Sequence, residues 1–142
     1  MRAQPALCLF LLLLPATLGS AAAQTAPPVI VPQELLQTGH AWDGSFWAYP
    51  ATPPQITLQR LRIPPDTTLG WHRHPMLNVA YVERGAITVE RRHDGGRRHF
   101  IAGSAIPEMM NVPHRGHTGA DGADLLIFYA GTPGMPLSIP VP

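Results

Sequence analysis

The sequence predicts an all-β fold, a sandwich or barrel, built as a single domain. The 142 residues include 17 prolines and 13 glycines, which is too many for long helices. No segment keeps a helical period over several turns, and short apolar or alternating runs are instead separated by turn residues. The chain has no internal repeat, which favours one barrel over a tandem pair.

The expected strands follow from these runs and their boundaries. The run QITLQRLRI ends at two prolines, and GWHRH ends at Pro75. A turn is expected at Arg84-Gly85 between two further strands, and DGG at 94–96 is typical of a hairpin turn. A last apolar strand, ADLLIFYAG, precedes a Pro-rich end. The expected strands are 55–63, 70–74, 77–85, 86–92, 97–103 and 123–131.

The N-terminus has the pattern of a secretory signal peptide. Arg2 precedes an apolar run at 6–14, and small residues lead to Ala21-x-Ala23 as the cleavage site. That run is too short to cross about 30 Å of hydrocarbon as a helix, so we expect a periplasmic or secreted protein without a membrane anchor. The expected divisions are a signal peptide at 1–23, a Pro-rich arm at 24–41, the main domain at 42–134 and a C-terminal tail at 135–142.

Composition narrows the classes of partner. Cys8, the one cysteine, lies in the expected signal peptide, so the mature chain would have no disulfide. The chain has no lysine, and its ten arginines face nine acidic residues. This balance gives no electrostatic basis for binding nucleic acid. The segment ERRHDGGRRH holds four arginines but is interpreted as the solvated tip of a hairpin.

Two histidines one residue apart are the first sign of a functional site. His72 and His74 fall in an expected strand, where alternate side chains share a face. Both imidazoles can therefore meet one metal ion, and imidazole suits Fe, Mn, Zn, Cu and Ni. The alternative is a coincidental pair on a surface strand.

The spacing of further residues resembles the two motifs of the cupin superfamily, G-x5-H-x-H-x3-4-E-x6-G and G-x5-P-x-G-x2-H-x3-N. The first corresponds to Asp66-x5-His72-x-His74-x3-Asn78-x6-Gly85. The second corresponds to Gly103-x5-Met109-x-Asn111-x2-His114-x3-Thr118. The resemblance spans roughly residues 55–131. It implies a cupin domain at 42–134 with a jelly-roll barrel (double-stranded β-helix), and one divalent transition metal held by His72, His74, His114 and, at the fourth position, Asn78.

Several positions depart from the motifs. Asp66 and Asn111 replace glycines, a mild change because Asp and Asn tolerate the left-handed conformation. Asn78 replaces the usual carboxylate with a weaker, neutral ligand. The site would then carry a charge of about +2, which favours an anionic substrate or bound hydroxide. Glu108 is the candidate replacement, as a ligand or as a catalytic general acid/base; the alternative is an outward-facing residue at a strand end.

Three functions remain open at this point. The first is an exported metal-dependent enzyme acting on a small anionic or chelating organic substrate, with the dioxygenase-type, isomerase or decarboxylase chemistry that the resemblance implies. The second is a non-catalytic periplasmic module that binds a small molecule beside a structural metal. The third is a metal-free jelly roll. The resemblance also implies a homodimer, and neither nucleic acid nor, after signal cleavage, a membrane is expected as a partner.

Overall fold

The computed structural model describes residues 27–142. The predicted signal peptide lies outside the described residues. Residues 27–32 contain no helix or strand and belong to a separate unit from the compact one, which runs from residue 33 to residue 142. Between residues 27 and 142 we find no helix long and apolar enough to cross a membrane.

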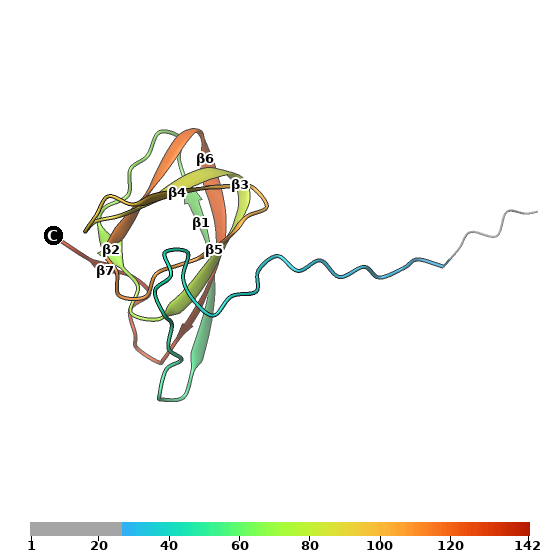
Figure 1. Cartoon of the computed structure of the whole chain (residues 1–142), viewed down its shortest axis with the longest axis horizontal. Coiled ribbons are helices and arrows are strands. Elements are labelled where there is room, and N and C mark those ends of the chain that lie inside the picture. Colours follow the sequence, from blue (N-terminus) through green and yellow to red (C-terminus); the bar gives the residue numbers. More distant parts are fainter. Residues whose placement is uncertain (1–26) are drawn as a thin grey trace, which may run out of the picture. The chain divides into compact units, whose positions relative to one another are not determined.

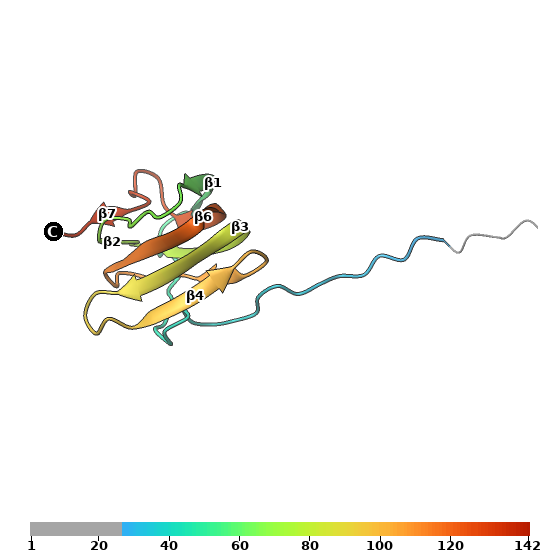
Figure 2. The same cartoon turned by 90° about the horizontal axis from the view of Figure 1, so that it is seen from above.

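Seven strands form the compact unit, and every pairing between them is antiparallel. They curve around a common interior in Figure 1, while Figure 2 shows β6, β3 and β4 side by side. The all-β prediction is therefore confirmed. The strands are β1 (Gln55–Ile63), β2 (His72–Arg73), β3 (Leu77–Arg91), β4 (Arg97–Ile101), β5 (Ala105–Pro107), β6 (His114–Gly131) and β7 (Ile139–Pro140).

The two longest strands, β3 and β6, pair along most of their length and form the spine of the fold. The first half of β3 pairs with the second half of β6, whose other edge takes β1. The second half of β3 pairs with the first half of β6, which also takes β2. β3 and β6 thus link the other strands into one seven-stranded sheet.

The spine bends where two glycines meet. The register of β3 against β6 shifts on both sides of Gly85, and both Gly85 and Gly122 have positive φ, at 73° and 63°. A Cβ atom on Gly85 would lie 2.1 Å from the Gly122 carbonyl oxygen. The backbones therefore approach too closely for any larger residue at Gly85.

The strand predictions succeed in part. The bounds 55–63 match β1, and the DGG turn joins β3 to β4. The prediction of a turn at Arg84-Gly85 is wrong, because β3 continues through a bulge there. The segment before 123 is also strand, since β6 begins at His114. Residues 135–142, predicted as a tail, include β7, which pairs with β2.

The two motif positions that lack glycine keep the glycine conformation. Asp66 has a φ of 48° and Asn111 a φ of 60°, and the structure shows no other non-glycine residue with positive φ between residues 27 and 142. The Asn111 carboxamide oxygen also accepts a hydrogen bond from Arg73 at 2.7 Å. The expectation that Asp and Asn can replace these glycines is confirmed.

Candidate metal centre

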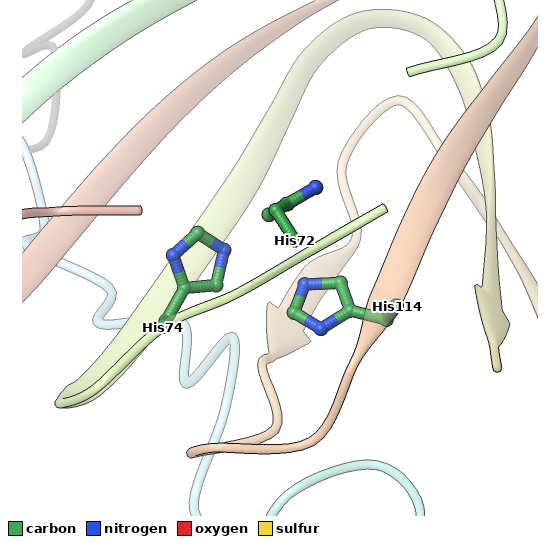
Figure 3. Close-up of side chains that lie close together, drawn as sticks. All are labelled: His72, His74 and His114. Carbon is green, nitrogen blue, oxygen red and sulfur yellow. The ribbon is translucent and has the colours of Figure 1, made fainter. Parts of the chain in front are cut away.

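Three histidines lie close together: His72 on β2, His74 directly after β2, and His114 at the start of β6. His72 on β2 lies directly opposite His114, the first residue of β6, and His74 lies two residues further on the same side. The ring centroids are 4.6 Å apart for His72 and His114 and 5.0 Å apart for each of the other two pairs. One ring nitrogen of each histidine lies within 4.8 Å of the others, and Figure 3 shows the rings gathered around a shared space.

Each imidazole is held in one tautomer by a backbone carbonyl. The Nδ1 atoms lie 2.8 Å from the Gly70 oxygen for His72, 2.7 Å from the Leu137 oxygen for His74, and 2.8 Å from the Val112 oxygen for His114. A carbonyl only accepts, so each Nδ1 carries the proton and donates it. Each Nε2 therefore keeps a lone pair, which is the arrangement found in metal-ligating histidines.

Burial keeps His74 and His114 neutral. Desolvation lowers the pKa of His114 to about 4 and also lowers the pKa of His74, although the nearby Glu108 opposes the shift at His74. Both imidazoles are therefore uncharged near neutral pH. That is the protonation state that a metal ligand needs.

Glu108 completes the group, and its predicted alternative as an outward-facing residue is excluded. Its side chain is buried, and desolvation raises the pKa of its carboxyl group, against the opposing effect of His74 and His72. Its Oε2 lies 3.4 Å from Nε2 of His114. Both atoms are buried, and neither has a hydrogen-bond partner among residues 27–142.

These atoms fit a metal cation. Two buried acceptors facing each other need a proton or a cation between them, and the three imidazole lone pairs converge on the same space. Three nitrogens with at most one carboxylate oxygen suit a transition metal and not Mg²⁺ or Ca²⁺, which prefer oxygen ligands. His72, His74 and His114 could therefore hold one divalent transition metal.

Asn78, the predicted fourth ligand, lies on β3, and its backbone carbonyl accepts a hydrogen bond from the Glu108 amide at 3.2 Å. Its side chain is buried, and within the described part of the chain neither its amide oxygen nor its amide nitrogen has a hydrogen-bond partner. It is not among the residues that line the cavity containing the three histidines and Glu108. Its role as a fourth ligand stays a prediction.

The histidines open into a cavity of about 480 Å³, within the usual range for small-molecule sites. Besides Glu108 and the three histidines, it is lined mainly by apolar side chains from the inner faces of β1, β3 and β6. Tyr129 also lines it, and burial raises the pKa of its phenol to about 12, so the hydroxyl stays protonated.

Sequence reasoning missed two parts of this cavity. Leu137, Ser138 and Pro140 from the C-terminal segment form part of its wall, and the Leu137 carbonyl orients His74. Nothing in the short run GMPLSIPVP indicated either role. Trp71 also lines the cavity, and the Arg115 guanidinium lies 4.2 Å from its ring centroid, a cation–π contact that holds the indole in place.

A second polar cluster lies around Glu90 on β3. Its carboxylate accepts hydrogen bonds from Arg115 at 2.9 Å, Arg97 at 3.0 Å and His117 at 2.6 Å. These bonds, chiefly those from the two arginines, lower the pKa of Glu90 to about 2. His117 lies on β6. Glu90 is therefore the centre of a set of ion pairs and, contrary to the prediction for ERRHDGGRRH, is not part of a solvated hairpin tip.

Comparison with known proteins supports the fold. No protein-family model matches the sequence, and no curated protein matches it. The DMSP lyase DddQ from Ruegeria pomeroyi superposes with a TM-score of 0.54 at 14% identity, over 61% of this chain and 43% of that one. A cupin-like protein from Thermotoga maritima superposes with a TM-score of 0.51 at 19% identity, over 61% of this chain and 64% of that one.

The chain thus spans less than two thirds of the length of either protein, and at these identities the likeness establishes the fold. The protein has the cupin fold, a jelly-roll barrel, with a three-histidine group that could hold a metal. This agrees with the cupin superfamily relationship that its two motifs indicate.

Proposed function

We propose that the protein is an exported metal-dependent enzyme that acts on a small organic substrate with an anionic or chelating end. One observation carries the proposal: three imidazoles and the Glu108 carboxyl meet inside a cavity whose other walls are mostly apolar. A cavity with a few convergent polar groups and shifted pKa values is the usual form of an active site.

The chain's own residues have distinct roles in this proposal. His72, His74 and His114 would hold the metal, with their Nδ1 protons fixed by backbone carbonyls. A bound Fe, Mn, Zn, Cu or Ni ion would supply Lewis-acid polarisation of substrate oxygens and, for redox-active ions, dioxygenase-type chemistry. Glu108, with its raised pKa, would hold or accept a proton beside the substrate.

A non-catalytic binding module is the second candidate, and one distance favours it. Because Glu108 Oε2 lies 3.4 Å from Nε2 of His114, Glu108 could act as a fourth ligand. A site closed by four protein ligands is typical of a structural metal. The role of Glu108 therefore separates the two candidates.

Glu108→Gln tests the choice between them. The protein would be loaded with each of the five metals and incubated, with and without oxygen, with a panel of small carboxylic, hydroxy and keto acids, and mass spectrometry would detect any product. The enzyme proposal expects turnover by the parent, at least 100-fold slower turnover by Glu108→Gln, and equal metal content in the two. Loss of metal from Glu108→Gln, with no turnover by the parent, would contradict it and leave the binding module.

Export belongs to the same proposal and has its own test. It depends on the signal-peptide pattern at 1–23. N-terminal sequencing of protein recovered outside the cytosol is expected to begin at Gln24. An intact N-terminus on protein confined to the cytosol would contradict export.

A further inference from the structure

The histidines and Glu108 are gathered at one end of the cavity, which is its polar end. Most of the remaining wall is apolar. The apolar wall includes Leu61, Leu69, Ile87, Val89, Leu125 and Ile127. Ile87, Val89, Leu125 and Ile127 are buried members of the main core, so this part of the wall is fixed by the packing of the barrel.

The cavity lining carries no cationic side chain. No arginine is among the lining residues in the part of the chain that the structure describes, and the sequence has no lysine. Arg115 lies over the Trp71 ring and is already bonded to Glu90. The only positive charge available to a ligand would therefore be that of the metal.

The polar end offers a partner to one anionic group of a ligand. A metal held by the three histidines would lie at that end, and one carboxylate of a ligand could bind it there. A second carboxylate would lie against the apolar wall without a partner, and burying an unpaired charge is costly.

The remaining polar side chains of the lining are neutral. Gln59 and Ser138 are both exposed and lie at the edge of the cavity. They can accept or donate hydrogen bonds to the far end of a ligand, but they cannot neutralise a charge there. The lining is therefore polar at the metal end, apolar along the middle and neutral at the rim.

We infer that the substrate is a monoanion with an apolar body, such as an aromatic or branched aliphatic monocarboxylate, and that small dianions are rejected. This inference rests on the proposed function in one respect, that the metal-containing cavity is the substrate site. It goes further in naming the class of substrate.

Binding of three probe anions tests the inference. Isothermal titration calorimetry on the zinc-loaded protein would compare the affinities of acetate, 3-phenylpropanoate and glutarate. Acetate has one carboxylate and almost no apolar body, 3-phenylpropanoate adds an apolar body to one carboxylate, and glutarate has a second carboxylate. Because each buried methylene group favours binding several-fold, we expect 3-phenylpropanoate to bind at least tenfold more tightly than acetate or glutarate.

A matched pair of variants on one strand checks where the apolar body lies. Leu61 on β1 lines the cavity, whereas Leu58 on the same strand points outward and is 63% exposed. Leu61→Gln is expected to reduce the preference for 3-phenylpropanoate over acetate at least fivefold, and Leu58→Gln to leave it unchanged. Thermal unfolding of both variants would verify that each is folded.

The outcomes separate this inference from the proposed function. Equal or tighter binding of glutarate to protein that holds one zinc ion, or no binding of any of the three anions, would overturn the inference while the metal site stands. A preference for 3-phenylpropanoate in protein that binds no metal would support the apolar site and overturn the metal-dependent function. An equal loss of preference in Leu58→Gln and Leu61→Gln would also overturn the inference.

Discussion

His72 and His114 lie opposite each other across the β2–β6 pair, with their ring centroids 4.6 Å apart. Each ring donates its Nδ1 proton to a carbonyl two residues earlier in its own chain segment, Gly70 and Val112. The same short-range geometry is thus used twice, and strand pairing then places the two lone pairs face to face. His74 differs, because its carbonyl partner comes from Leu137 in the distant C-terminal segment.

That difference predicts an effect of removing the C-terminus. Deleting residues 137–142 removes the Leu137 carbonyl and β7, so the His74 ring loses its fixed orientation. Since loss of such an outer hydrogen bond weakens metal binding about 10–100-fold, we expect a decrease of that size in zinc affinity, measured by competition with a chelator. Deleting only residues 141–142 keeps the carbonyl and serves as the control. Equal affinities in the two deletions would contradict the role of Leu137.

The bend in the spine predicts a large difference between two glycine substitutions. Gly85→Ala adds a Cβ atom 2.1 Å from the Gly122 carbonyl oxygen, whereas Gly103, with a φ of 89°, has nothing within 4 Å of its Cβ position. Both changes place an alanine in the left-handed conformation, which costs about 1–2 kcal/mol. We expect Gly103→Ala to lower the free energy of unfolding by about that amount and Gly85→Ala by about 3 kcal/mol or more. Denaturant unfolding measures both, and equal effects would show that the close approach does not constrain the fold.

The Glu90 cluster predicts how stability depends on pH. Bonds from Arg115 and Arg97 lower the pKa of Glu90 from 4.5 to about 2 in the folded protein. A carboxyl group whose pKa is lowered by folding stabilises the protein above its unfolded value, and this contribution is lost as the pH falls from 4.5 toward 2. The melting temperature of Glu90→Gln should therefore be lower than that of the parent near about pH 7. This difference should shrink as the pH falls from 4.5 toward 2.

Glu83→Gln is the control for this comparison. Glu83 pairs with Arg60 alone, at 2.8 Å, and Arg60 is largely exposed, so little stability is expected from the pair. A difference between parent and Glu90→Gln that stays constant from neutral to acid pH would contradict the assignment of the cluster.

Local sequence was a good guide to the fold where turn residues mark both ends of a strand. The prolines on either side of β1 gave its bounds, and the left-handed positions at Asp66 and Asn111 followed from the motif glycines that these residues replace. The first part of β6, HRGHTGADG, was missed because Gly and Asp have low strand propensity there. Its pairing with β3 and β2 outweighs that propensity.

The site was predictable to a similar extent. Strand alternation brought His72 and His74 to one face, and motif spacing added His114. The burial of Glu108 could not be derived, because alternation is unreliable beside Pro107. The contribution of Leu137 depends on a long-range contact with His74, for which the local sequence carries no signal.

The measurement that tests the central claim most directly is the metal content of the mature protein. Mass spectrometry would compare the parent with His72→Ala and with His93→Ala, since His93 is an exposed histidine outside the cluster. We predict about one transition-metal ion per chain in the parent and in His93→Ala, and none in His72→Ala. A parent that binds no metal after reconstitution with iron, manganese, zinc, copper and nickel, or an unchanged metal content in His72→Ala, would contradict the assignment of His72, His74 and His114 as a metal centre.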